Sequence, residues 1–246
     1  MNPGLDVLIP QWPAPARVRA LQTQRSGGVS QGPFASLNLG EHVGDVPAHV
    51  AENRRRLQAL LPDAPQWLCQ VHGTAVVRLP CAVAQPMADA AWTDRPGVVC
   101  AVQTADCLPV LLCSDDGAVV AAAHAGWRGL ADGVLEAVLA ALPCPAARVL
   151  AWLGPAIGAD AFEVGPEVRE RFLAADAGNH ACFRRGAGDR WYADLFALAR
   201  GRLRACGVRA VHGGGLCTVG DPRRWFSHRR DGRCGRMASL IWIDRD

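Results

Sequence analysis

Residues 98–142, VVCAVQTADCLPVLLCSDDGAVVAAAHAGWRGLADGVLEAVLAAL, decide the fold. This stretch holds two nearly continuous apolar runs, at residues 98–113 and 118–124. Such runs are typical of strands that are buried on both faces. In residues 129–142, Leu and Val recur at the spacing of a helix. The stretch therefore predicts buried strands followed by a helix.

Weaker patterns extend this alternation in both directions along the chain. Residues 25–44 are polar and rich in glycine, which indicates a loop and a candidate binding segment. Alternating strands and helices predict an α/β fold, a single layered domain over residues 1–246 with mixed β-sheets flanked by helices. The other expected strands are residues 7–10, 18–23, 67–79, 148–153, 208–212 and 239–243, and the other expected helices are residues 49–61, 164–175 and 192–206.

Composition argues against several classes of function. Half of the 246 residues are hydrophobic, a fifth are charged, and the net charge is only +3. This balance gives no reason to expect a nucleic acid or a membrane as partner. The ten cysteines form no Cys-x-x-Cys pair, and the N-terminus has no secretory leader pattern. We therefore expect reduced thiols in a cytoplasmic protein. The sequence leaves the oligomeric state open, and a monomer is the expectation.

Two histidines and one cysteine stand at or just beyond apolar runs, where a strand ends and presents its side chains. They are His72 in QVHG, Cys107 in TADC and His124 in AHAGWRG. Two imidazoles and a thiolate form a three-ligand set for zinc, and three protein ligands leave one position open, as in catalytic sites. Taken singly, each has a simpler interpretation, as a half-buried histidine or a small core cysteine. Their combination favours the metal site.

The segment after His124 has the order strand, glycine-rich turn, helix N-terminus. Backbone N–H groups and the helix dipole at such a turn attract an anion, and Arg128 would add a two-pronged donor. The alternative is a tight turn with Arg128 in solvent, and the local spacing leaves both open. Asp89 and Asp106 are candidates for orienting a metal ligand or moving a proton, although a solvated or capping carboxylate is the simpler interpretation. His42 lies in polar surroundings and is interpreted as a surface residue.

Several further segments carry a resemblance to a known family. They are SGGVS (26–30), SLNLG (36–40), HVGD (42–45), QVHG (70–73), TADCLPV (104–110), HAGWRG (124–129), GPAIG (154–158), RRDG (229–232) and GRMA (235–238). In this order, and over nearly the whole chain, they resemble the YfiH-like laccase-domain family. Its members are described as multicopper polyphenol oxidases and as purine nucleoside phosphorylases.

The resemblance implies a layered α/β domain, similar also to the catalytic domain of cytotoxic necrotizing toxins. It implies that His72, Cys107 and His124 bind zinc and are catalytic. The implied reactions are phosphorolysis of adenosine, inosine and methylthioadenosine to base and sugar 1-phosphate, and deamination of adenosine. The expected partners are purine nucleosides and phosphate. The candidate residues for binding them are Arg128, Arg25, Arg229 and Asn38.

Family members commonly have aromatic residues where this chain has Val219 and His228, which leaves the favoured nucleoside open. Three other functions are alternatives. Copper in the same ligand set would make a polyphenol oxidase, but a multicopper oxidase needs His-x-His pairs, and the seven histidines form none. A metal-free Cys107–His124 pair would make a cysteine hydrolase or amidase linked to peptidoglycan editing. In a non-enzymatic domain, zinc would only hold loops together.

Overall fold

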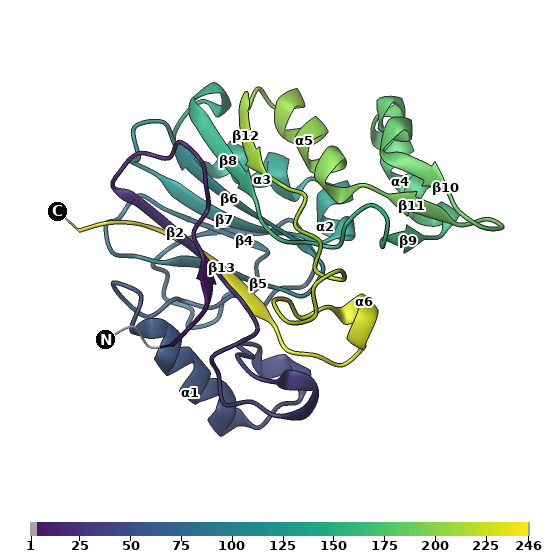
Figure 1. Cartoon of the computed structure of the whole chain (residues 1–246). Coiled ribbons are helices and arrows are strands. Elements are labelled where there is room, and N and C mark those ends of the chain that lie inside the picture. Colours follow the sequence, from purple (N-terminus) through teal and green to yellow (C-terminus); the bar gives the residue numbers. More distant parts are fainter. Residues whose placement is uncertain (1–3, 246) are drawn as a thin grey trace.

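Two β-sheets packed face to face form the middle of the protein (Figure 1). The computed structural model describes residues 4–245, so the first three residues of the N-terminal stretch considered for a leader lie outside it. The six-stranded sheet has the order β12 (Ala210–Gly213), β8 (Val149–Leu153), β6 (Leu108–Ser114), β7 (Val120–Ala125), β4 (Ala90–Thr93) and β3 (Val76–Arg78). The four-stranded sheet has the order β1 (Val7–Leu8), β2 (Val18–Thr23), β13 (Met237–Ile243) and β5 (Cys100–Thr104).

Helices cover the outer faces of this pair of sheets. The helices of the described residues are α1 (Pro47–Gln58), α2 (Trp127–Asp132), α3 (Val134–Ala141), α4 (Pro166–Ala175), α5 (Leu195–Ala205) and α6 (His228–Asp231), with short 3-10 helices η1 (Gly32–Phe34), η2 (Glu41–Val43), η3 (Ala146–Arg148) and η4 (Ala177–Cys182). Helices α3 and α5 pack on the six-stranded sheet, and α1 packs on the four-stranded sheet. No helix of residues 4–245 has the length and apolar character that crossing a membrane requires. The mixed α/β fold with several sheets flanked by helices is confirmed.

The central strand β6 explains why the apolar pattern is continuous. Successive side chains of a strand point to opposite faces of its sheet. Leu111 packs into the core between the two sheets, whereas Val110 and Leu112 pack into the core beneath the helices. All three side chains are fully buried. Because both faces of β6 are covered, the strand is apolar from Leu108 to Cys113, and only its last residue, Ser114, is polar.

The apolar run of residues 98–113 is two strands rather than one. β5 ends at Thr104 and β6 begins at Leu108, and the two belong to different sheets. The intervening turn holds Asp106 at a φ of 90°, a conformation that L-residues rarely adopt. Both strands are buried on both faces, so a three-residue turn leaves hardly any trace in the hydrophobic pattern.

Other elements also differ from the expected bounds. The expected helix of residues 129–142 is α2 followed by α3, separated at Gly133, whose φ is 100°. The expected strand of residues 67–79 is shortened to β3, and His72 lies in a turn before it with a φ of 62°. The sequence did not indicate β4, α6 or the three-stranded sheet of β10 (Phe183–Arg185), β11 (Trp191–Ala193) and β9 (Glu163–Val164). Strands of two to four residues are too short to show a period.

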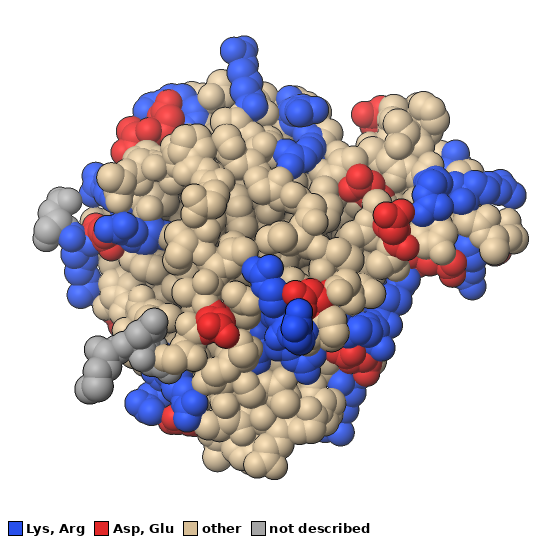
Figure 2. Space-filling view, in the orientation of Figure 1, with Lys and Arg blue, Asp and Glu red and all other residues tan. Residues whose placement is uncertain are grey.

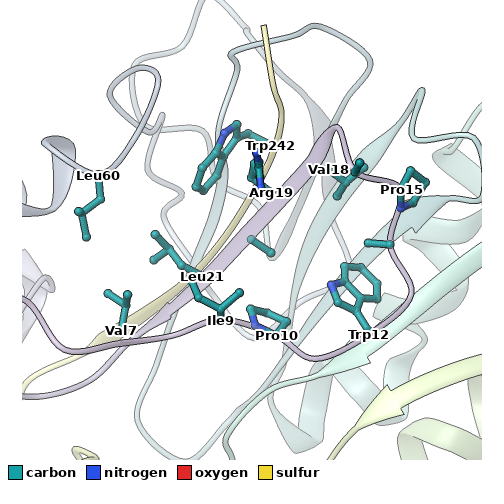
Figure 3. A pocket seen from close by; sticks show the side chains of 13 residues that line it. Val7, Ile9, Pro10, Trp12, Pro15, Val18, Arg19, Leu21, Leu60 and Trp242 are labelled. Carbon is teal, nitrogen blue, oxygen red and sulfur yellow. The ribbon is translucent and has the colours of Figure 1, made fainter. Parts of the chain in front are cut away.

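A hollow of about 530 Å³ lies on the outer face of the four-stranded sheet, beside α1 (Figure 3). Trp12, Leu21 and Trp242 contribute apolar walls. Arg19 is its one charged residue, and its guanidinium is paired with Asp244 at 2.7 Å. Because this hollow has no His, Cys, Asp or Glu in its lining, it offers no group for acid–base, nucleophilic or metal chemistry.

We expect Leu111→Ala to lower the free energy of unfolding by about 2–5 kcal/mol, because it leaves a cavity between the two sheets. Val46→Ala is the matched control: this side chain is 51% exposed, and its change should stay within about 0.5 kcal/mol. Chemical denaturation of both variants measures the difference. Equal transition midpoints would contradict the two-sheet core described here.

Candidate metal centre

Three side chains that are far apart in the sequence meet at one edge of the six-stranded sheet. The ligand atoms of His72, Cys107 and His124 all lie within 4.8 Å of one another. Sγ of Cys107 is 3.7 Å from Nε2 of His72, and the two imidazole rings are 4.7 Å apart between centroids, nearly perpendicular. His124 is fully buried on β7, Cys107 is half-buried just before β6, and His72 is exposed. The structure thus brings together the three residues singled out in the sequence.

A single carboxylate holds two of these residues in place. Asp89 is fully buried, and its Oδ1 lies 2.8 Å from Nδ1 of His124. The same carboxylate accepts hydrogen bonds from the backbone N–H groups of Val71, His72 and Gly73, at 3.2, 2.9 and 2.7 Å. Burial by itself raises the pKa of Asp89, but these donors and His124 together lower it below its usual range. The interpretation of Asp89 as a solvated carboxylate is therefore wrong.

Asp106 holds the third residue in a similar way. Its carboxylate accepts hydrogen bonds from the hydroxyls of Thr218 and Ser227, at 2.5 and 3.0 Å, and from the backbone N–H of Arg229 at 2.6 Å. These partners belong to the C-terminal part of the chain, which is thereby tied to the turn that carries Cys107. Asp106 is buried rather than solvated, although its bond to Arg229 at the start of α6 agrees with a capping role.

The electrostatics of the site favour a sulfur ligand in its charged form. Burial raises the pKa of the Cys107 thiol, yet the adjacent His124 and His72 lower it to about 6. Burial lowers the pKa of His124, yet Cys107 and Asp89 raise it to about 9. Without a metal ion, the two groups are therefore a thiolate beside an imidazolium. A bound metal ion would take the thiolate as a ligand and replace the proton of the imidazolium.

The residues present fit a zinc ion. Two imidazoles and a thiolate are donors that zinc prefers, and three of them leave a position for water or substrate. The Asp89–His124 contact has the form in which a carboxylate orients a metal-binding histidine through its other ring nitrogen. Gly126 lines the same space, where a Cβ atom would lie 2.7 Å from Cδ2 of His72 and 3.1 Å from Sγ of Cys107. A glycine is therefore needed here for the three donors to approach.

Two cavities meet at this centre. The larger, of about 390 Å³, has polar walls that include His42, Gln70, Gln103, Arg128 and Arg236. The smaller, of about 180 Å³, has the apolar walls Trp127, Ile157, Phe162 and Leu195. Ala105, Cys107 and His228 line both cavities. The candidate metal centre therefore stands where a polar compartment adjoins an apolar one.

The four residues expected to bind substrate or phosphate have different locations. Arg128 lines the polar cavity and stacks on Trp127, 4.4 Å from the ring centroid. Arg229 lines the apolar cavity, and its guanidinium donates to the carbonyl of Glu163 at 2.9 Å. It belongs to α6, around which basic side chains gather among acidic ones (Figure 2).

The other two lie outside both cavities. The guanidinium of Arg25 donates to the backbone carbonyls of Ala35 and Pro222, at 3.0 and 2.8 Å. Asn38 is fully buried, and its Oδ1 accepts from the backbone N–H of Arg236 at 2.9 Å. Both side chains hold loops in this structure, and neither lines either cavity, so a contact of Arg25 or Asn38 with substrate stays a prediction.

Five residues of the polar cavity were not singled out from the sequence: His42, Gln70, Gln103, Thr104 and Arg236. His42, interpreted as a surface residue, is exposed at the mouth of this cavity and is part of its lining. Four of the five lie inside segments that carry the family resemblance, and Gln103 immediately precedes one. Their position in these segments was the available signal. A recurrence of polar residues does not by itself indicate which face of the molecule they share.

The fold and this site define a mixed α/β protein with one His–Cys–His centre within the described residues. The chain belongs to the family described as multi-copper polyphenol oxidoreductase laccase, which matches residues 19–244. It is 58% identical over 238 residues to a purine nucleoside phosphorylase of Pseudomonas aeruginosa, covering 96% of this chain and 98% of the relative. It is 53% identical over 240 residues to purine nucleoside phosphorylase YfiH of Escherichia coli, with the same coverage.

Solved structures give the same placement. A Neisseria meningitidis protein of the DUF152 family superimposes with a TM-score of 0.93 at 50% identity, covering 97% of this chain and 99% of that one. The Bacillus licheniformis hypothetical protein YfiH superimposes with a TM-score of 0.87 at 30% identity, covering 92% and 93%. The resemblance to the YfiH-like family is thereby confirmed.

We expect Asp89→Asn to weaken zinc binding by about 10–100-fold, because the residue that orients a ligating histidine contributes on this scale. Competition against a chromophoric zinc chelator measures the affinity, and a thermal melt checks that the variant is folded. Asp94→Asn is the control, since this carboxylate forms only a surface pair with Arg78. Equal zinc affinities of the two variants would remove Asp89 from the metal centre.

Proposed function

We propose that this protein is a zinc-dependent purine nucleoside phosphorylase in which His72, Cys107 and His124 bind the metal ion. The observation that carries the proposal is the convergence of these three donors in the wall of the polar cavity, where Cys107 also lines the adjoining apolar cavity. The names of the Pseudomonas and Escherichia relatives support the choice of reaction. The proposal extends to adenosine, inosine and methylthioadenosine as substrates, and to deamination of adenosine.

The two cavities match the two reactants. A purine base is flat and largely apolar, and Trp127 and Phe162 in the smaller cavity offer aromatic surface to it. Phosphate is an anion, and the larger cavity is lined by the guanidinium groups of Arg128 and Arg236. No Asp or Glu is among the residues that line the larger cavity. The base and the phosphate would therefore lie on opposite sides of Cys107.

The geometry suits cleavage of an N-glycosidic bond. Positive charge develops on the sugar as the bond to the base breaks, and an anion held beside the sugar stabilises that charge and is placed for attack. A zinc ion held by His72, Cys107 and His124 would supply a Lewis acid and, for deamination, would lower the pKa of water to about 7. Asp89 and Asp106 are both engaged with protein donors. The histidines left in the cavity walls to transfer a proton to the leaving base are therefore His42 and His228.

Of the alternative functions, one is favoured by a specific observation. The thiolate–imidazolium pair of Cys107 and His124 is the arrangement that a cysteine hydrolase or amidase would use. A multicopper oxidase is not favoured, because the described residues bring together a single group of three ligands. A purely structural zinc would need a fourth protein ligand, and within residues 4–245 no fourth side chain joins the group.

Purified protein should convert adenosine to adenine and ribose 1-phosphate only when phosphate is present. Cys107→Ala should lower kcat/KM by more than about a hundredfold. A residue that only orients a metal ligand contributes about 10–100-fold to metal affinity or activity, and loss of a ligand should cost more. Cys182→Ala is the control, because that cysteine lies beside the small sheet and lines neither cavity. Chromatography of the products gives the answer. Full activity in a folded Cys107→Ala protein would overturn the proposal, and inosine as the sole product would indicate a deaminase.

Removal of the metal ion separates the zinc enzyme from the cysteine hydrolase. Treatment with a strong chelator should abolish phosphorolysis, and one equivalent of zinc should restore it, because the metal ion completes the site. A Cys–His hydrolase would keep its activity after the same treatment. Metal analysis of the untreated protein should find about one zinc ion per chain, whereas stoichiometric copper would favour the oxidase.

A further inference from the structure

Thr104 lies at the end of β5 and lines the polar cavity beside the candidate metal centre. It pairs with Met237 of β13, which places it next to Arg236. Its side chain is 1% exposed, and its Oγ1 has no hydrogen-bond partner among the described residues. A buried hydroxyl without a partner is unfavourable, because it has lost its hydrogen bonds to water. Such a group next to a cavity indicates a partner that arrives with a ligand.

The other buried threonines show that this is an exception. Oγ1 of Thr23 accepts a hydrogen bond from the backbone N–H of Ala238 at 2.9 Å. The hydroxyl of Thr93 donates to the carbonyl of Leu79 at 2.9 Å, and that of Thr218 donates to Asp106. Of the threonines buried within residues 4–245, Thr104 alone lacks a partner. The missing hydrogen bond of Thr104 is therefore specific to this position and is not shared by the other buried threonines.

The charges of the residues around Thr104 indicate which kind of ligand would bind there. The charged side chains that line its cavity, apart from the zinc-binding set, are Arg128 and Arg236. No carboxylate is in that lining, and Asp89 and Asp106 are already engaged with other donors. The charged groups around the hydroxyl are therefore cationic, which favours an anionic acceptor as its partner. An oxyanion supplies acceptor oxygens to the hydroxyl and to both guanidinium groups at once.

Arg236 is itself held in a fixed position beside Thr104. Its backbone N–H donates to Asn38, and its guanidinium donates to the carbonyls of Cys234 and Gly235 at 3.0 and 3.1 Å. A Cβ atom at Gly40 would lie 2.8 Å from Cγ of Arg236, so the absence of a side chain there makes room for it. A guanidinium that is positioned before the ligand arrives loses little conformational entropy on binding.

We propose that the Thr104 hydroxyl, together with Arg236, forms the inorganic-phosphate subsite of this protein and donates a hydrogen bond to a phosphate oxygen. The assignment rests on the proposed phosphorylase function for the identity of the anion. The hydroxyl determines affinity for phosphate and leaves affinity for the nucleoside unchanged. It makes no favourable contribution to the stability of the unliganded protein, because it has no partner there.

Thr104→Val, which replaces the hydroxyl by a methyl group of similar size, tests the proposal in the zinc-loaded protein. Calorimetric titration with inorganic phosphate should give a Kd at least about tenfold higher than in the wild type, as for a lost hydrogen bond to a charged group. The KM for phosphate should rise similarly, with the KM for adenosine unchanged. The Tm without phosphate should not fall. Thr104→Ser, which keeps the hydroxyl, should retain phosphate affinity close to that of the wild type.

Thr93→Val is the matched control, because its hydroxyl is buried and has a partner. It should lower the Tm by about 2–4 °C, as expected for the loss of one hydrogen bond in a chain of this size, and leave the phosphate Kd unchanged. A phosphate Kd in Thr104→Val within twofold of the wild type would overturn the proposal. So would a fall in Tm equal to that of Thr93→Val, since it would reveal a structural partner for the hydroxyl.

The two proposals fail in different ways. If the wild type binds phosphate in a manner that depends on Thr104 but does not cleave nucleosides, the phosphate subsite stands and the phosphorylase function fails. If nucleosides are cleaved and the KM for phosphate in Thr104→Val is unchanged, the function stands and the subsite fails. A wild type that does not bind phosphate would overturn the subsite directly.

Discussion

The Asp89 carboxylate is the group on which the rest of the site depends. It is fully buried, and four donors compensate for the loss of water around its charge: Nδ1 of His124 and the backbone N–H groups of residues 71–73. Through these bonds one side chain sets the orientation of an imidazole on the rigid strand β7 and the conformation of the turn that carries the other imidazole. The separation of the two imidazoles therefore depends on the hydrogen bonds of Asp89 as well as on the sheet.

Asp106 has the corresponding role for the turn that carries Cys107, the sulfur donor. It stabilises the turn between two strands of different sheets and ties that turn to Thr218, Ser227 and α6. Within residues 4–245, His72 and Asp106 are the non-glycine residues with positive φ, and both lie in turns that one of these carboxylates holds. Conformations of this kind persist where the surroundings determine them fully, and they concentrate at functional sites. Neither acid lines the polar cavity, whose charged residues apart from the candidate metal ligands are arginines.

The basic residues place a further limit on the chemistry. All 26 of them are arginines, so the chain has no lysine amine for a covalent intermediate. The reactive groups of the site are imidazoles, one thiol and guanidinium groups, which bind metal ions, phosphate and protons. The arginines also have structural uses: Arg25 holds two loops through their carbonyl groups, whereas Arg128 and Arg236 face the polar cavity. The positive charge of an arginine does not by itself show whether the side chain holds a loop or faces the cavity.

The continuous apolar runs of residues 98–113 and 118–124 were sufficient to predict buried strands and an α/β fold, because a strand covered on both faces has no polar side. Two signals in the sequence predicted the donor set of His72, Cys107 and His124. These residues stand at the ends of apolar runs, and the segments around them carry the family resemblance. The break at Asp106, the burial of Asp89 and the approach of Thr104 to Arg236 come only from the tertiary structure. These three features depend on hydrogen bonds between residues about 20 to 130 positions apart in the sequence. Neither the hydrophobic period nor the composition of a sequence carries information about such pairs.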